Sequence, residues 1–106
     1  MNEMIGKIRE TVNALFRELD SKSMDRDYYA YAYVCGSKEL NGKNMLVSVA
    51  NDAGSAVSYW KLSVANKRGG FSGLARVEFD DRRGGDPVEH VCSAFETKLS
   101  RLYGAK

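Results

Sequence analysis

The sequence contains few of the residues on which metal and thiol chemistry depend. It has one histidine, His90, and two cysteines, Cys35 and Cys92. Three such ligands cannot complete the usual four-ligand zinc site without help from a carboxylate. The two thiols fit a reducing compartment, in which cysteines remain free. We therefore expect no metal ion, no cofactor and a cytoplasmic location.

Long apolar runs and an excess of one charge are also missing. No apolar stretch approaches the length of a membrane span, and residues 1–19 are amphipathic and charged, unlike a signal peptide. The 16 basic and 14 acidic residues leave a net charge of +2, which is too even to predict a polyanionic partner by itself. These absences favour a soluble domain without a membrane partner.

The patterns that are present predict one domain with a helix at each end. A chain of 106 residues is expected to form a single domain with one core. Apolar residues that recur at helical spacing predict a helix over about residues 3–20. A second helix is expected to begin at Asp86 and Pro87, as N-cap and first helical residue, with Glu89 completing a capping box. Gly104 is typical of its end.

The segment between the helices is predicted to form a sheet. Four runs rich in β-branched and aromatic residues predict strands over residues 28–36, 43–50, 56–65 and 74–80. Short polar or glycine-containing connections join consecutive runs, and they predict an antiparallel meander. We therefore predict a two-layer α+β domain: an N-terminal helix, a four-stranded antiparallel meander and a C-terminal helix (α-β-β-β-β-α).

The turn residues assign the strand residues to faces, because successive residues of a strand point to opposite sides of a sheet. Asn41-Gly42 is typical of a type I′ turn, so we expect Val34 opposite Val49. A tight turn at residues 52–55 with a two-residue loop at Ala53-Gly54 gives the third strand a matching assignment, whereas a three-residue loop would reverse it. One face is then apolar. The other, which we call the tyrosine face, collects Tyr29, Tyr31, Tyr33, Cys35, Leu46, Ser48, Val57, Tyr59, Lys61, Arg76 and Glu78.

The tyrosine face is the candidate partner-binding surface. Two helices packed 8–10 Å apart cover about the width of four strands, so both can share the apolar face. Tyrosine and arginine are enriched at binding hot spots, and an open tyrosine face presents both. Two alternatives stay open: the face is simply solvated, or one helix covers each face and buries the tyrosines. The candidate residues are Tyr29, Tyr31, Tyr33, Tyr59, Lys61 and Arg76.

Two glycine-rich loops add a second candidate feature. Residues 66–73 and 81–85 combine arginine with glycine, as in segments that bind RNA. Neither loop has the GK[ST] ending of a phosphate-binding P-loop. In a meander, alternate connections lie at the same end of the sheet, so one end gathers the candidate phosphate-binding residues Lys38, Lys43, Lys67 and Arg68.

No constellation in the sequence predicts catalysis. His90 and Cys92 are two residues apart on a helix, so their side chains point in different directions. Nothing in the sequence places Cys35 beside His90 as a nucleophile and its base. We assign the remaining clustered carboxylates to a strand end, a turn and a helix cap rather than to a metal site: Asp80, Asp81 and Asp86.

The order helix, three strands, helix resembles that of double-stranded RNA-binding domains. The predicted fourth strand is an addition to that pattern. The acidic residues Asp86 and Glu89 also begin the last helix where that family presents lysines to phosphate. We therefore infer no membership of that family.

Two functions remain as expectations. The first is a non-catalytic protein-binding domain that acts as an inhibitor, adaptor or immunity-type protein. Small α+β domains without motifs are frequent among phage-encoded inhibitors and toxin-immunity proteins, which makes this an argument by analogy. The alternative is a nucleic-acid-binding module in which the tyrosines stack on bases and the basic residues hold phosphates. Homodimerisation through the tyrosine face is compatible with both.

Overall fold

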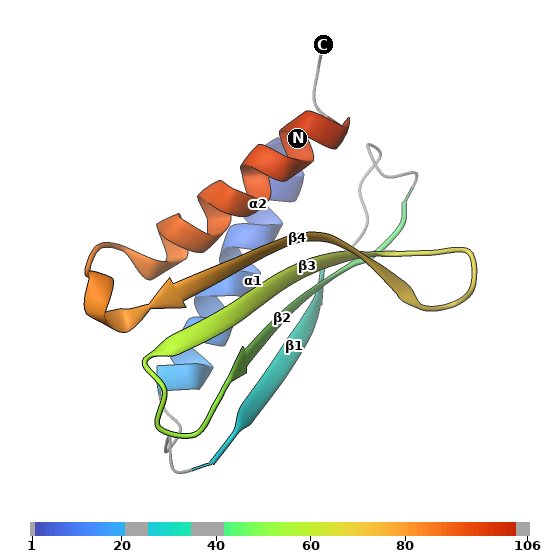
Figure 1. The fold of residues 1–106 in the computed structure, drawn as a ribbon. Helices are drawn as coiled ribbons and strands as arrows, with labels where there is room; N and C mark the ends of the chain where they lie inside the picture. Colours follow the sequence, from blue (N-terminus) through green and yellow to red (C-terminus); the bar gives the residue numbers. More distant parts are fainter. Residues whose placement is uncertain (1, 21–25, 35–41, 104–106) are drawn as a thin grey trace.

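The computed structural model describes residues 2–20, 26–34 and 42–103, and it confirms the predicted two-layer α+β architecture. A four-stranded antiparallel sheet lies between an N-terminal and a C-terminal helix in sequence (Figure 1). The elements are α1 (Asn2–Asp20), β1 (Tyr28–Val34), β2 (Met45–Asn51), β3 (Val57–Ala65), β4 (Phe71–Asp80), a single 3-10 turn η2 (Asp81–Arg83) and α2 (Pro87–Tyr103).

Both helices pack on the same side of the sheet (Figure 1). The strand order is β1-β2-β3-β4, so β1 and β4 are the edge strands. α1 contacts β1 and β2, α2 contacts β4, and the two helices contact each other. This arrangement excludes the alternative with one helix on each face, and it leaves the tyrosine face without a covering layer among the described residues.

The core lies between the helices and the apolar face of the sheet. Phe16 of α1 stacks on Trp60 of β3 with ring centroids 4.2 Å apart, and it meets Phe79 edge-on at 5.9 Å. The indole N–H of Trp60 donates to Ser58 Oγ at 2.9 Å, so the largest buried ring leaves no donor unpaired. Further buried residues are Met4, Ile8, Val12, Leu15, Leu19, Val34, Met45, Val47, Val49, Leu62, Val64, Val91, Cys92, Phe95 and Leu99.

The predicted register of the first hairpin is wrong, but the predicted faces are right. Val34 pairs with Met45, and Val49 pairs with Ala30. This register is not the one that a two-residue turn at Asn41-Gly42 would give, and residues 35–41, with the asparagine of that turn, lie outside the described residues. The observed register is displaced by an even number of residues. Because side chains alternate with period two, such a displacement keeps the described residues of β1 and β2 on their predicted faces.

β4 is longer than predicted and contains a bulge. It begins at Phe71, inside the segment that the sequence assigns to a glycine-rich loop. The register of β3 and β4 shifts between Leu62 and Ser63, so that Leu74 is an extra residue on β4. Residues before the bulge therefore point to the face opposite to the one that strict alternation from Phe79 would give.

The start of α2 follows the prediction in part. The Asp86 carboxylate accepts hydrogen bonds from the backbone N–H groups of Val88 (3.0 Å) and Glu89 (3.3 Å), which makes it the N-cap. The Glu89 side chain does not complete the expected capping box. Its carboxylate instead accepts from Arg9 of α1 at 2.6 Å and from Ser93 at 3.2 Å. Glu89 therefore ties the two helices together.

Candidate functional site

Four exposed tyrosines lie on the tyrosine face. Tyr29, Tyr31 and Tyr33 follow one side of β1 and are 62%, 53% and 62% exposed, and Tyr59 of β3 is 43% exposed. Neighbouring rings of the β1 row are in contact, with centroids 6.2 Å apart for Tyr29 and Tyr31 and 5.7 Å apart for Tyr31 and Tyr33. The row is thus a packed aromatic ridge rather than a set of independent side chains.

The tyrosine face is concave at the end near the β3–β4 loop. The rings of Tyr33 on β1 and Phe71 on β4 lie 5.8 Å apart between centroids, although β2 and β3 separate these two strands. In a flat sheet the two strands would be about 14 Å apart. The sheet therefore curls until its opposite edges meet through this aromatic pair.

Sequence reasoning missed Phe71 because of the bulge. Strict alternation from Phe79 would turn Phe71 toward the core, whereas the extra residue Leu74 turns it to the tyrosine face. The glycine spacing of residues 66–73 also favours a loop over a strand. Phe71 itself is an aromatic residue that suits a strand, and this was the only signal available.

The floor of the tyrosine face is not exposed as predicted. Ser48 and Ser63 are buried, and Leu46 is half-buried. Ser48 lies beside Tyr31 in the register, and Leu46 lies beside Tyr33. The exposed surface of this face therefore consists mainly of the tyrosines and the charged side chains rather than of these central residues.

Lys61 of β3 and Arg76 of the edge strand β4 place two neighbouring positive charges on the tyrosine face. They are direct partners in the β3–β4 register, and like charges opposite one another oppose strand pairing. Neither forms an ion pair within the described part of the chain. Lys61 lies over Gly73, where an added Cβ would be 3.1 Å from Lys61 Cε.

A shallow hollow of about 440 Å³ lies beside these two cations. Its side-chain lining on the tyrosine face comes from Tyr59, Lys61, Arg76 and Glu78. Tyr59 and Glu78 are partners in the register, as are Lys61 and Arg76. The hollow therefore offers one exposed ring, two cations and one carboxylate within two adjacent rows of the sheet.

Three of the four candidate phosphate-binding residues lie at one end of the described sheet. The β1–β2 and β3–β4 connections lie at the same end of the sheet, and the N–H of Ala65 donates to the carbonyl of Asn44 at 2.9 Å. Lys43, Lys67 and Arg68 are exposed there. Lys38, the fourth predicted phosphate-binding residue, and Cys35 lie outside the described residues.

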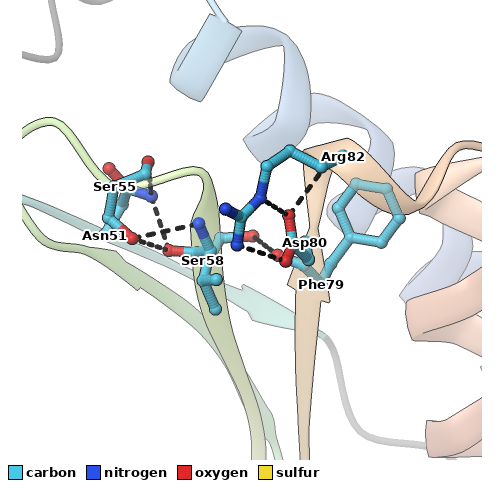
Figure 2. Close-up of polar contacts among 7 residues, drawn as sticks. Asn51, Ser55, Ser58, Phe79, Asp80 and Arg82 are labelled. Carbon is cyan, nitrogen blue, oxygen red and sulfur yellow. Dashed lines mark hydrogen bonds and ion pairs between the residues drawn. The ribbon is translucent and has the colours of Figure 1, made fainter.

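The opposite end of the sheet is held by its own polar groups (Figure 2). Asn51 donates through Nδ2 to the carbonyls of Ser55 (3.2 Å) and Val57 (2.7 Å). Arg82 donates through Nε and Nη2 to the Asp80 carboxylate at 2.9 and 2.8 Å, and these bonds lower the pKa of Asp80 to about 2. The Oδ1 atom of Asn51 is buried without a partner.

The remaining candidate residues do not meet in a site. Cys92 is buried, and burial raises the pKa of its thiol to about 11, which suppresses the reactive thiolate. His90 Nε2 lies 3.0 Å from the carbonyl oxygen of Glu78 and so occupies the outer edge of β4. Within residues 2–20, 26–34 and 42–103, no group of three or more histidine, cysteine or acidic side chains could hold a metal ion.

Comparisons with known proteins add no family to this description. No family model, no curated protein and no solved structure matches the chain. In the described part of the chain, neither helix has the length and apolar character needed to cross a membrane.

Proposed function

We propose that this chain is a non-catalytic protein-binding domain, an inhibitor, adaptor or immunity-type protein that covers a partner's surface with its tyrosine face. The observation that carries the proposal is the exposure of four tyrosines on one sheet face while both helices cover the other. Tyrosine supplies a large, rigid contact area at a low cost in conformational entropy. The ring contacts along β1 reduce that cost further, because they hold the side chains in place before binding.

Lys61 and Arg76, which form no ion pair within the described residues, support the same surface as the binding site. Lys61 and Arg76 lie in the row of the sheet that contains Tyr31. Like charges opposite one another oppose strand pairing, and neither cation forms an ion pair within the described residues, so both are available to a partner. A partner with acidic groups opposite them would gain both aromatic contact and charge complementarity.

Affinity capture from the native source with matched variants tests the proposal. Immobilised wild-type protein, Tyr31→Ala and Leu102→Ala are compared with and without nuclease treatment. Leu102 is a suitable control because it is a large apolar residue that is 48% exposed but lies on α2. We expect one protein to be retained by the wild type and by Leu102→Ala, lost with Tyr31→Ala and insensitive to nuclease. Equal retention by all three would refute a role for the tyrosine face.

A second candidate function is single-stranded nucleic-acid binding, favoured by the unpaired Lys61 and Arg76 beside exposed rings. It ranks second because Tyr31 and Tyr33 pack at an interplanar angle of 82°, which occupies one ring face that a base would need. Titration of the tyrosine fluorescence with oligothymidine at two salt concentrations tests it. Strong, salt-dependent quenching that Tyr31→Ala removes would favour nucleic acid.

Homodimerisation through the tyrosine face remains a prediction. A dimer of this kind would cover the surface proposed for the partner. Light scattering of the wild type and Tyr31→Ala, measured before any capture experiment, separates the two cases. A wild-type dimer that Tyr31→Ala converts to a monomer would identify a second copy as the occupant.

A further inference from the structure

A second hollow lies on the far side of Arg76, between the edge strand β4 and α2. It has a volume of about 310 Å³, and it is lined by Arg76 of β4 and by two basic residues of α2, Lys98 and Arg101. Thr97 adds a hydroxyl group, while Ala75 and Ala94 leave space between the strand and the helix. No carboxylate lines this hollow in the described part of the chain. Its chemistry therefore suits an anionic group.

The outer edge of β4 borders this hollow with backbone groups that face away from β3. The N–H of Asp81 donates to the carbonyl of Ala56 at 3.0 Å, which identifies this pair as a hydrogen-bonded one. Such pairs alternate along an antiparallel ladder, so the N–H and C=O groups of Glu78 and Arg76 point outward. The contact between the Glu78 carbonyl and His90 at 3.0 Å agrees with this direction.

His90 therefore contacts the outward carbonyl group of Glu78 but not the outward backbone groups of Arg76. Arg76 is the next residue along β4 whose backbone groups face outward, and it is one of the residues that line the hollow. No described segment pairs with this edge, because β4 is the last strand of the sheet. An edge strand with free N–H and C=O groups is a template for an added strand.

We propose that the β4 edge at Arg76, together with Lys98 and Arg101 of α2, binds an extended acidic segment of the partner protein. The segment adds to β4 as a further strand through the outward backbone groups of Arg76, and its carboxylates meet Lys98 and Arg101 on the α2 side. The proposal rests on the proposed function in one respect, that the partner is a protein. It adds a second contact surface and a chemistry for the partner.

The spacing of the cations fits an extended chain. Lys98 and Arg101 are three residues apart on one side of α2, which corresponds to a rise of about 4.5 Å. Side chains two residues apart on a strand lie about 6.6 Å apart on the same face. Long, flexible basic side chains span this difference, so acidic residues at alternate positions of the added strand can meet both cations.

The same features argue against two other occupants. A second copy of this chain would bring its own Arg76 to the same edge, so a symmetric pairing of the two β4 strands would oppose like charges. Single-stranded nucleic acid is bound mainly by aromatic stacking along a basic groove. Among the described side chains, no aromatic one lines this hollow.

Titration of the isotope-labelled full chain with defined probes, followed by amide NMR shifts, tests the proposal. The main probe is a short peptide that alternates glutamate with valine. Its matched controls are the same peptide with glutamine in place of glutamate, and the glutamate peptide with alternate backbone amides methylated. We expect the glutamate peptide to shift the amides of Arg76 and of residues 97–101, and both controls to bind about tenfold more weakly or not at all.

A pair of charge-reversal variants locates the binding. Lys98→Glu with Arg101→Glu should weaken the glutamate peptide about tenfold. Arg17→Glu with Arg83→Glu changes the net charge equally at exposed positions away from the hollow, and it should leave the affinity within about twofold. Equal losses in both variants, equal binding of the glutamine peptide, or no shift at Arg76 would overturn the proposal.

Two further experiments distinguish this proposal from a phosphate site and from the proposed function of the tyrosine face. Inorganic phosphate or oligothymidine that shifts the same amides at lower concentration than the peptide would show a phosphate site and overturn the proposal. Tyr31→Ala should leave peptide affinity within about twofold, because Tyr31 does not line this hollow. If Tyr31→Ala abolishes capture of the native partner while the peptide fails to bind, the proposed function stands and this inference fails.

Discussion

The end of the sheet beside the β2–β3 turn and the tyrosine face contain similar residues, but these residues have different partners. At that end, Arg82 forms two hydrogen bonds to Asp80, and Asn51 bonds to the carbonyls of the turn (Figure 2). On the tyrosine face, Arg76 belongs to the same strand as Asp80 but has no carboxylate partner within the described residues. Arg82 therefore has a carboxylate partner within the fold, whereas Arg76 has none within the described residues.

The aromatic residues show the same difference. Trp60 and Tyr59 are neighbours on β3, yet Trp60 is enclosed by Phe16 and donates its N–H to Ser58, whereas Tyr59 lies open beside the hollow. One ring therefore contributes to folding, and the other is available for a contact outside the chain. The following predictions test whether the covered residues stabilise the fold while the exposed residues of the tyrosine face contact a partner.

The largest effect is expected on the covered side of the sheet. Trp60→Ala should reduce the free energy of unfolding by about 3–5 kcal/mol, because it removes the largest buried ring and leaves a cavity against Phe16. That is a large share of the stability of a small domain. Urea unfolding followed by circular dichroism measures it. A loss below about 1 kcal/mol would mean that the core does not depend on this contact.

Tyr31→Ala is the counterpart on the open side. We expect a loss of unfolding free energy of about 1 kcal/mol or less, from the ring contact with Tyr33 and the lower strand propensity of alanine. Binding to the partner should weaken by roughly 1–3 kcal/mol, the usual hot-spot range. Urea unfolding and calorimetric titration measure the two quantities.

Leu102→Ala is the matched control for this variant, since it removes an exposed apolar side chain from α2. Its binding free energy should stay within about 0.5 kcal/mol of the wild type. A several-kcal/mol loss of stability in Tyr31→Ala would contradict the observed exposure of the tyrosines.

The faces of the strands could be predicted from the sequence, whereas the curvature of the sheet could not. The pairing of Val34 with Met45 differs from the predicted pairing with Val49, and the faces survived because the displacement is even. The contact between Tyr33 and Phe71 depends on the bulge at Leu74 and on the curl of four strands together. Local alternation contains no information on either feature, because both arise from how whole strands pack.

The edge hollow escaped prediction for a related reason. Arg76 was a candidate on the tyrosine face, but Lys98 and Arg101 are ordinary surface residues in the helical pattern. They become neighbours of Arg76 only because α2 packs beside β4. A sequence pattern assigns each residue to one side of its own helix or strand. Which helix packs beside which strand has to come from the structure.

A smaller effect is expected at the cap of α2. Asp86→Ala should destabilise the domain by about 1 kcal/mol, because the N–H groups of Val88 and Glu89 lose their acceptor. Asp86→Asn retains an acceptor and should recover most of the loss. Binding by the folded protein should be unchanged in both variants. Thermal unfolding measures the stability, and a binding defect at full helicity would place Asp86 in the partner's contact surface.

The smallest expected effect is a difference between Arg82 and Arg76 variants in the pH dependence of their stability. The hydrogen bonds from Arg82 lower the pKa of Asp80 from 3.8 to about 2. A carboxyl group with a lowered folded-state pKa contributes stability above its unfolded pKa, and that contribution disappears as pH falls through the folded value. The stability difference between the wild type and Arg82→Gln should therefore be constant above about pH 5 and shrink between about pH 4 and pH 2.

Arg76→Gln serves as the matched variant, because Arg76 has no carboxylate partner in the described chain. Its stability difference from the wild type should not change across that window. Urea unfolding of the three proteins at half-unit pH steps measures this, and a pH-dependent difference for Arg76→Gln would mean that Arg76 is paired within the fold and is not reserved for a partner.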